Sequence, residues 1–264
     1  MIGKANFKIN LGLYVTEKRP DGFHNLETVL YPVDNVCDSI EIVPADQMRF
    51  EMSGGDFVTE QEKNLCVKAF RLLQDHYHLP DVHIRLDKKI PSGAGLGGGS
   101  ADAATVLKMT NRLFNLAISN DLLKEYAASL GSDVAFFIDN VPSYATGKGE
   151  ILTPIQLDLS GKVISVFKPE VSVSTAEAYA HVTPLSSRPC LKNLIKEPIS
   201  HWKFLIVNDF EISVFQKYPI LSEIKKKYYD LGADYAALSG SGSSLFAIGD
   251  KSIQLSSFFA GIDL

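Results

Sequence analysis

The sequence predicts a fold of mixed strands and helices arranged in two units. Apolar and polar residues alternate with period two near the start of the chain, which is typical of strands. Apolar residues at helical spacing follow between residues 65 and 130. The pattern then loosens at Gly147, Gly149 and Pro154, which suits a domain boundary, before strands and helices resume. We therefore expect an N-terminal domain over residues 1–152 and a C-terminal domain over residues 153–264.

Composition narrows the class of protein. With 264 residues and 45% hydrophobic content, the chain can bury one large core or two moderate ones. The formal net charge of -5 argues against a broad nucleic-acid surface, and no apolar run approaches the roughly 18 residues of a membrane span. Cys37, Cys66 and Cys190 lack C-x-x-C spacing, which indicates buried thiols in a reducing cytoplasm. We expect a soluble cytoplasmic protein with a small-molecule substrate and no nucleic-acid, membrane or obligate protein partner.

A strand with one buried face is predicted from Phe7 to Val15. Apolar residues alternate strictly along it, so Lys8 and Asn10 share the opposite face. An ordinary solvated strand face explains these two polar residues. Their closeness on one face also allows a functional pair, and the sequence leaves both interpretations open.

Residues 18–24 combine a turn with an aromatic ring and a histidine. Pro20-Asp21-Gly22 marks the turn, and Phe23 and His24 follow at once. They could form only the tip of a hairpin. A ring that stacks and an imidazole that hydrogen-bonds are equally what a planar base requires. Further strands are predicted over residues 26–33, 39–43 and 48–52.

A helix is predicted from Leu65 to His76, with Asn64 as its N-cap. His76 and His78 lie at its polar end. Their spacing could suggest a metal site, but no third ligand is near them in the sequence, so surface histidines are favoured. A strand over residues 82–86 follows.

The most distinctive feature is the glycine-rich run of residues 91–104. Glycines this dense let a loop turn its N–H groups inward without obstruction by side chains. Apolar residues at helical spacing follow, so a helix is predicted to begin near Ser100 and to point its positive end at the loop. A flexible linker is the plain alternative, but linkers rarely run straight into an amphipathic helix. The run therefore favours a phosphate-binding loop.

Two better-known phosphate motifs do not fit this run. Gly93, Gly95 and Gly98 match the dinucleotide fingerprint, but that motif needs an acidic residue closing a second strand about 20 residues later, where Asp121 instead opens a helix. The spacing also resembles the nucleotide-binding P-loop, but Gly99 stands where its lysine should be. Positive charge for a phosphate must come from elsewhere in the chain.

Charged residues on either side of the run are candidates. Lys88 and Lys89 could only solubilise a turn, or they could supply the charge that the loop lacks. Asp133 follows a helix that is predicted over residues 121–130 and ends at Gly131. A helix N-cap or turn role is the plain interpretation of Asp133, while a carboxylate against apolar neighbours can carry chemistry if a lysine faces it. The sequence leaves that pairing open.

The second unit alternates short elements. Strands are predicted over residues 163–167, 204–207, 235–238 and 245–248, and helices over residues 175–180 and 220–231. The lysines at 225–227 are explained by a solvated helix face. Serines and glycines at 239–244 join the last two strands. A tight hairpin explains this loop, and a second clamp on phosphate is the alternative.

Three separated segments together resemble the GHMP kinase superfamily: residues 7–11, 91–104 and 238–243. Residues 8–11, 19–24, 95–100 and 133–137 are similar, more narrowly, to the members that act on a cytidine diphosphate conjugate of methylerythritol. The resemblance spans nearly the whole chain. It implies a two-domain α+β fold, in which an ATP-binding N-terminal domain resembles domain 2 of ribosomal protein S5 and the C-terminal domain is a ferredoxin-like α/β sandwich.

The resemblance also implies an activity and a set of site residues. The activity is ATP-dependent phosphorylation of the hydroxyl at the 2-position of the methylerythritol part, in non-mevalonate isoprenoid precursor biosynthesis, with Mg²⁺ accompanying ATP on ligands that are unknown. The implied catalytic pair is Lys8 and Asp133. The implied adenine site comprises Asn64, Leu65 and Lys88, and the implied phosphate site comprises Pro91, Ser92, Gly93, Ala94, Gly95, Leu96, Gly97, Gly98, Gly99, Ser100 and Ala101. The implied substrate site comprises Asn10, Phe23, His24, Thr175 and Tyr179.

The chain departs from this family at two places. Phe23 stands where tyrosine is common, which keeps the stacking ring and loses a hydroxyl, and Ala101-Asp102 stands where Ser-Asn is frequent. Mevalonate or homoserine would be alternative acceptors, but neither carries a base for Phe23 and His24 to stack on. A non-catalytic nucleotide-binding sensor is the alternative from another class, against which the presence of both Lys8 and Asp133 argues.

Overall fold

The computed structural model describes residues 1–54 and 61–264, which form two compact units. The first unit comprises Met1–Lys8, Pro32–Ser92 and Gly97–Val141, and the second comprises Ile9–Tyr31, Gly93–Leu96 and Pro142–Leu264. Two long strands, β1 (Ile2–Lys18) and β2 (His24–Pro44), contribute residues to both units. Because these units are not contiguous in the sequence, the division expected after residue 152 stays a prediction.

Strand β4 is the centre of the sheet in the first unit. β4 (Val82–Lys88) pairs antiparallel with the second half of β2, with Ser39 opposite Asp87, and parallel with β3 (Arg49–Gly54). Its side chains alternate at the C-terminal half between buried and exposed, as the period of two requires. The predicted strands at 48–52 and 82–86 are therefore confirmed.

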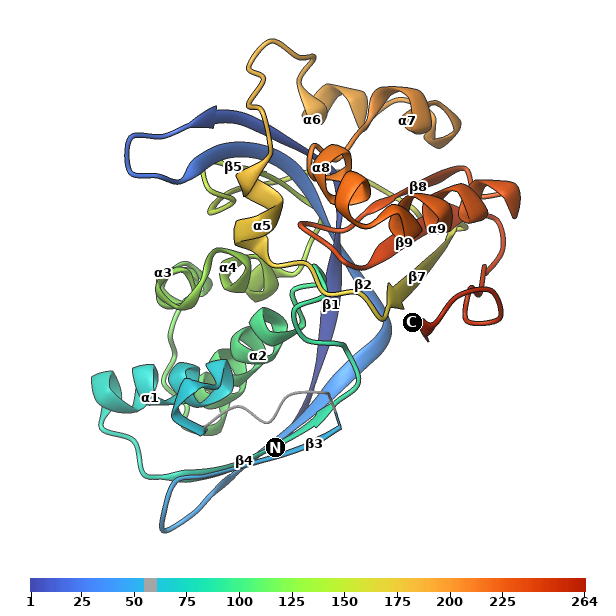
Figure 1. Ribbon diagram of the computed structural model, residues 1–264. Coiled ribbons are helices and arrows are strands. Elements are labelled where there is room, and N and C mark those ends of the chain that lie inside the picture. The colour runs from blue at the N-terminus through green and yellow to red at the C-terminus, as the bar shows by residue number, and fades with distance from the viewer. Residues whose placement is uncertain (55–60) are drawn as a thin grey trace. The chain divides into compact units, whose positions relative to one another are not determined.

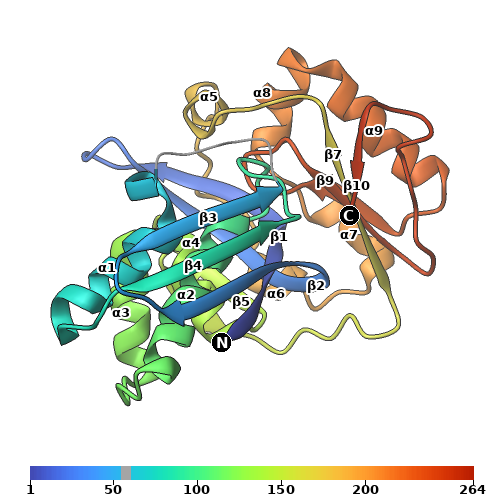
Figure 2. The same cartoon turned by 90° about the horizontal axis from the view of Figure 1, so that it is seen from below.

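Four helices cover one face of these strands, as both Figure 1 and Figure 2 show. They are α1 (Leu65–Tyr77), α2 (Gly98–Leu113), α3 (Asn120–Leu130) and α4 (Ser132–Asp139), and a short 3-10 helix η1 (Gln61–Lys63) precedes α1. Asn64 caps α1 as predicted, because its side chain accepts a hydrogen bond from the Cys66 N–H at 2.8 Å. The helix predicted near Ser100 begins slightly earlier, at Gly98.

Two predictions about the first strands are wrong. Residues 26–33 and 39–43 belong to one continuous strand, β2, because the polar residues between them stay extended and do not form a turn. The strand from Phe7 to Val15 is buried on both faces, so Lys8 and Asn10 are only 4% and 3% exposed. Strict alternation reports one apolar face, but it does not reveal that protein covers the polar face as well.

A four-stranded antiparallel sheet forms the core of the second unit. Its order is β10 (Gly261–Asp263), β7 (Val163–Pro169), β9 (Leu245–Gly249) and β8 (Tyr235–Leu238). The same unit contains β5 (Ser143–Thr146), which pairs with the first half of β2 and with β6 (Ile151–Pro154). Its helices are α5 (Thr175–Ala180), α6 (Leu191–Leu194), α7 (Ile199–Leu205), α8 (Phe210–Lys217) and α9 (Pro219–Asp230).

The strand predicted over residues 204–207 is also wrong. Phe204 and Leu205 form the end of α7. A short apolar run has the same appearance in a strand and in a helix, and Trp202, which is buried one turn before Ile206, anchors this run as a helix. The other predicted strands and helices of this unit are confirmed within about two residues.

The serine- and glycine-rich loop at 239–244 is a hairpin, as predicted, and it also binds part of the glycine run. It joins β8 to β9, and the Asn208 side chain donates hydrogen bonds to the carbonyls of Leu238 and Gly240. Ser239 Oγ donates to the Gly95 carbonyl at 2.9 Å, and the Ser244 N–H donates to the Ala94 carbonyl at 3.2 Å. Its role as a second phosphate clamp stays a prediction.

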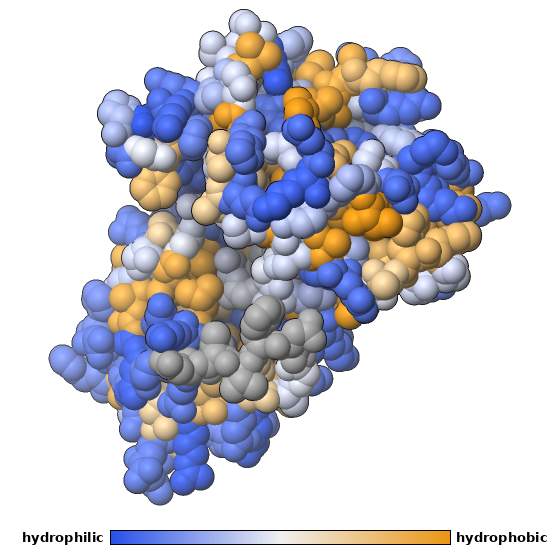
Figure 3. Space-filling model, in the orientation of Figure 1, coloured by the Kyte–Doolittle hydropathy of each residue, from blue (hydrophilic) through white to orange (hydrophobic). Residues whose placement is uncertain are grey.

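Polar and charged residues cover most of the face in Figure 3, with apolar residues gathered in smaller patches. Within residues 1–54 and 61–264, no helix combines the length and the apolar character that crossing a bilayer requires. All three cysteines are free thiols. Cys66 is buried as expected, whereas Cys37 and Cys190 are half-buried.

Two glycines of the run offer a matched test of the hairpin contact. Gly95 (φ +78°) and Gly93 (φ +65°) are both left-handed, so alanine is strained at either position by roughly 1–2 kcal/mol. At Gly95 a Cβ would also lie 2.0 Å from the Ser239 carbonyl oxygen, whereas at Gly93 nothing lies within 4 Å. We expect Gly95→Ala to lower the free energy of unfolding by about 1–3 kcal/mol more than Gly93→Ala. Denaturant unfolding measures both, and equal losses would contradict the packing described.

Candidate functional site

Lys8 and Asp133, which are 125 residues apart in the sequence, meet in the first unit. Lys8 lies on β1 and Asp133 lies in the first turn of α4, with 3.5 Å between Nζ and Oδ2. The lysine side chain is 5% exposed and the aspartate side chain 38% exposed. A buried ammonium thus holds a carboxylate that remains open to a ligand, so the solvated-face interpretation of Lys8 is wrong.

The glycine run passes directly beside this pair. Gly97 is the N-cap of α2 and has a φ of +70°. A Cβ there would lie 3.1 Å from Phe137 Cε2 and 3.2 Å from Lys8 Cε. Only glycine lets the backbone lie this close to Lys8. The start of α2, the Lys8 side chain and helix α4 are therefore in contact.

The start of α2 provides hydrogen-bond donors for an anion. The Ala101 N–H donates to the Gly97 carbonyl at 2.9 Å and makes the first bond of the helix. Helix geometry leaves the N–H groups of Gly98, Gly99 and Ser100 without a partner inside the helix. Together with the positive end of the helix dipole, these donors fit a phosphate group.

Two of the residues predicted to hold adenine lie beside the same helix start. A Cβ at Gly99 would lie 3.9 Å from Leu65 Cδ1, and one at Gly98 would lie 3.0 Å from Lys88 Nζ. Asn64 is adjacent to Leu65, and its side-chain oxygen is used in the N-cap of α1. Leu65 and Lys88 thus lie beside the glycine run, and their role in binding adenine stays a prediction.

Lys88 belongs to a buried cluster of charges, which we call the Asp38–Lys88–Asp102 cluster. The three side chains are 0%, 4% and 3% exposed. Lys88 Nζ donates to the Asp38 carboxylate and lies 3.0 Å from Asp102 Oδ2. Two carboxylates already surround this ammonium. Lys88 is therefore poorly placed to supply charge to a bound phosphate, and Lys8 is the better candidate.

The cluster contains two acids and one base, and this excess of acid affects the protonation of Asp102. Burial, more than any other cause, raises the pKa of Asp102 to about 7, against the lowering effect of Lys88 and with a further increase from Asp38. Asp102 Oδ1 is buried and has no hydrogen-bond partner among the described residues. Sequence reasoning missed Asp38 and noted Asp102 only as a departure from the family. Asp38 stands among other polar and acidic residues of β2, so no local signal distinguished it.

A cavity of about 550 Å³ in the second unit collects four of the five predicted substrate residues. They are Phe23 from the turn before β2, His24 at the start of β2, and Thr175 and Tyr179 from α5. The rings of His24 and Tyr179 stack with 4.8 Å between centroids and 20° between planes. The hairpin-tip interpretation of residues 18–24 is therefore incomplete, because the tip forms the wall of a cavity.

The cavity also contains charge that the sequence did not reveal. Lys18 and Lys148 line it, and Lys148 Nζ lies 4.9 Å from the centroid of the Phe23 ring. Burial, aided by Lys18, lowers the pKa of His24, so the imidazole is neutral at pH 7 and can both donate and accept a hydrogen bond. Aromatic rings, a neutral imidazole and two ammonium groups suit a planar base that carries an anionic group. No local signal distinguished Lys148 from other turn residues.

The fifth predicted substrate residue, Asn10, lies elsewhere. Its side chain donates to Thr28 Oγ1 at 3.0 Å, and Thr28 Oγ1 donates to the Gly12 carbonyl at 2.6 Å. Asn10 is buried and is not among the residues that line the cavity. Its part in substrate binding stays a prediction.

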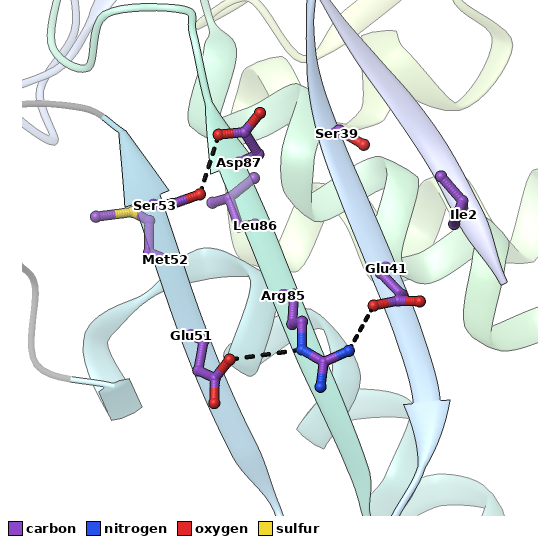
Figure 4. A pocket seen from close by; sticks show the side chains of 9 residues that line it. All are labelled: Ile2, Ser39, Glu41, Glu51, Met52, Ser53, Arg85, Leu86 and Asp87. Atoms are coloured by element: carbon purple, nitrogen blue, oxygen red, sulfur yellow. Dashed lines mark hydrogen bonds and ion pairs between the residues drawn. The ribbon is translucent and has the colours of Figure 1, made fainter.

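A further cavity, of about 480 Å³, lies on the sheet of the first unit. Figure 4 shows Arg85 between Glu41 and Glu51, and Ser53 beside Asp87. Arg85 contacts the two glutamates at 2.7 and 3.5 Å, so the guanidinium in this cavity already has two acidic partners. The lining contains none of the predicted site residues. This cavity is therefore a weaker candidate for the site of chemistry.

The raised pKa of Asp102 predicts a pH-dependent stability. Because the folded pKa (about 7) exceeds the unfolded value of 3.8, the favourable contribution of the protonated form is complete below pH 3.8 and is lost as the pH rises to about 7. Asparagine cannot ionise, so only the native chain should lose this stability as the pH rises. We therefore expect the Tm of Asp102→Asn, relative to that of the native chain, to be several degrees higher at pH 7.5 than at pH 4.5. Calorimetry measures this difference, and a difference that stays flat would contradict the assignment.

Comparison with protein families adds two matches. The model of the GHMP kinases N terminal domain matches residues 64–144, and the model of the GHMP kinases C terminal domain matches residues 191–257. The N-terminal match includes the glycine run, Lys88 and Asp133. The C-terminal match includes the hairpin loop that binds the Gly95 carbonyl.

Comparison with individual proteins extends the likeness over nearly the whole chain. A Bacteroides fragilis protein named 4-diphosphocytidyl-2-C-methyl-D-erythritol kinase is 51% identical over 94% of this chain and 92% of its own length. A crystal structure of 4-(cytidine 5'-diphospho)-2C-methyl-D-erythritol kinase superposes with a TM-score of 0.82 at 30% identity, covering 100% of this chain and 98% of the other. A homoserine kinase from Cytophaga hutchinsonii shares only the fold, at 19% identity and a TM-score of 0.70, over 94% of this chain and 85% of its own. The glycine run, the Lys8–Asp133 pair and these likenesses lead to one conclusion: the chain belongs to the GHMP kinase family, with its two-domain α/β fold.

Proposed function

We propose that this protein is an ATP-dependent kinase that phosphorylates the 2-position hydroxyl of 4-diphosphocytidyl-2-C-methyl-D-erythritol, in non-mevalonate isoprenoid precursor biosynthesis. The observation that carries the proposal is the meeting of Lys8 and Asp133 beside Gly97, at the start of helix α2, where free N–H groups favour an anion. Relatives of this name that are about half identical to the chain support the same acceptor.

The chemistry needs little from the protein beyond positioning and charge neutralisation. The acceptor hydroxyl oxygen attacks the γ-phosphorus of ATP, its proton passes to the Asp133 carboxylate, and the bond to the β-phosphate oxygen breaks so that ADP leaves with the electron pair. Lys8 stabilises the negative charge on the phosphoryl group in transfer. Asp133 suits the role of base because its carboxylate is partly exposed, while Lys8 is held almost completely buried.

The nucleotide phosphates bind along residues 91–101 in this proposal. The N–H groups of Gly98, Gly99 and Ser100 point out of the helix start and need an acceptor. Adenine binds near Asn64, Leu65 and Lys88, of which Leu65 and Lys88 lie beside Gly99 and Gly98.

The cytidine part of the acceptor binds in the cavity lined by Phe23, His24, Thr175 and Tyr179. The stacked pair of His24 and Tyr179 offers an aromatic surface to a base, and Lys18 and Lys148 offer charge to a diphosphate. Mevalonate and homoserine carry no base, so this aromatic lining favours the cytidine conjugate over both. Asn10 completes the substrate site in the proposal.

Magnesium is part of the proposal because nucleotide phosphates require it. The described residues contain no group of three or more His, Cys, Asp or Glu side chains that could hold a metal. Mg²⁺ in kinases keeps several waters and binds through one or two carboxylates together with the phosphates, so it needs no such group. When bound, it would neutralise phosphate charge. The protein ligands of Mg²⁺ are unassigned.

We also propose that the protein is cytoplasmic and that its partner is a small-molecule substrate.

Substitution of the catalytic pair tests the chemistry. We expect Lys8→Ala and Asp133→Ala each to lower kcat by about 10²-fold or more, because each removes a group that acts in the transition state. Coupled ADP release with the cytidine-linked acceptor measures the effect. Lys4→Ala on the same strand and Asp139→Ala on the same helix are matched controls that should keep near-native turnover.

Near-native turnover in the Lys8 or Asp133 variant would remove that residue from the mechanism. ATP binding by the native chain without turnover on the cytidine-linked, mevalonate or homoserine acceptor would instead indicate a non-catalytic nucleotide sensor.

The aromatic cavity predicts acceptor specificity. We expect His24→Ala and Tyr179→Ala to raise the KM for the cytidine-linked acceptor about tenfold or more, because base stacking contributes roughly 1–3 kcal/mol per base. The KM for ATP should change less than twofold. Steady-state kinetics measures both constants, with Phe258→Ala, an exposed ring outside this cavity, as the control. An unchanged acceptor KM in both variants would exclude this cavity as the cytidine site.

A further inference from the structure

The Asp38–Lys88–Asp102 cluster connects the two ends of the glycine run. Asp38 Oδ1 accepts hydrogen bonds from the N–H groups of Lys89 at 2.6 Å and Ile90 at 2.8 Å, which immediately precede the run. Lys88 Nζ lies 3.0 Å from Asp102 Oδ2, near the end of the run in the first turns of α2. One group of charges therefore holds the residues where the loop leaves β4 and where it enters α2.

The contact between Lys88 and α2 is close enough to set the position of the helix. A Cβ at Gly98 would lie 3.0 Å from Lys88 Nζ and 2.8 Å from Ile90 Cγ2. Gly98 is therefore in direct contact with both residues. The N–H groups of Gly98, Gly99 and Ser100 are rigid parts of the same first turn, so any movement of the turn moves all three donors.

The charge balance argues that the cluster positions the helix and does not bind the phosphates itself. Lys88 is 4% exposed at its side chain and is enclosed between the side chains of Asp38 and Asp102. An ion pair this deeply buried costs desolvation energy that its own attraction barely repays. The presence of this cluster beside the glycine run is therefore better explained by the contact that it makes between β4 and the start of α2.

We propose that Asp102 is a positioning residue for the nucleotide: through Lys88 it holds the first turn of α2 against β4, so that the N–H groups of this turn meet the phosphates of ATP. The inference rests on the proposed function, because it assumes that this turn binds the nucleotide. Asp102 itself does not touch the nucleotide. Misplacement of donors by about 1 Å is enough to cost a large factor in binding or rate.

The binding of a non-hydrolysable ATP analogue, measured by calorimetry, tests the inference without turnover. Asp102→Ala leaves Lys88 paired with Asp38 and removes the ion pair between Lys88 and α2, so we expect Kd to increase about tenfold or more. Asp102→Asn keeps an oxygen that can accept from Lys88, so its Kd should stay within about threefold of the native value. The KM for the acceptor at saturating ATP should change less than twofold in both variants.

A control separates positioning from general stability. Leu73→Ala removes a buried side chain of α1, eight residues along from Leu65, and should lower Tm while Kd stays within about threefold. If Asp102→Ala does not fold, Asp102→Ser replaces it, because its hydroxyl is too short to reach Lys88. A native Kd in the Asp102→Ala or Asp102→Ser variant would overturn the inference. So would an increase in Kd for Asp102→Asn and Leu73→Ala as large as the increase for Asp102→Ala.

The same measurements distinguish failure of this inference from failure of the proposed function. A native chain that binds the analogue but phosphorylates no cytidine-linked acceptor would contradict the proposed function, while weakened binding in Asp102→Ala would still support the positioning role. A native chain that does not bind the analogue would overturn both.

Discussion

The approach of the Lys8 side chain to the backbone of Gly97 is the constraint on which the rest of the candidate site depends. A lysine can remain nearly buried only if a carboxylate balances its charge, and Asp133 does so at 3.5 Å. The loop can pass this close only if it has no side chain at residue 97. These two requirements bring the ammonium, the carboxylate and the start of α2 into contact. A phosphate on that helix start and an alcohol near Asp133 would then be neighbours of one cation.

Glycine acts differently at different positions of the run. Gly97 and Gly98 make room for Lys8 and Lys88 in the first unit, and Gly95 makes room for the backbone of Ser239 in the second. Gly93 faces open space, so only its left-handed backbone calls for glycine. The density of glycine in this segment therefore reflects close packing against other segments as much as access for a ligand.

The two lysines near the loop have opposite characters. The Lys8 ammonium lies 3.5 Å from Asp133, whose side chain is partly exposed, whereas Lys88 is enclosed by Asp38 and Asp102. The departure of the chain from its family at Asp102 thus lies in a cluster that holds the loop. In our proposals, Lys8 neutralises phosphate charge and the Asp38–Lys88–Asp102 cluster places the start of α2.

Local sequence determined much of this protein. The period-two alternation, the N-cap at Asn64, the glycine run with its helix, and the serine–glycine hairpin were all predictable, because each depends on residues within a few positions of one another. Motif resemblance added the family and the residues to examine. Tertiary structure alone decided which distant side chains meet: Lys8 with Asp133, Lys88 with Asp38 and Asp102, and His24 with Tyr179. It also decided that β1 is buried on both faces and that residues 204 and 205 are helical. Periodicity describes only the residue's own segment, whereas burial and charge pairing depend on what the rest of the chain places against it.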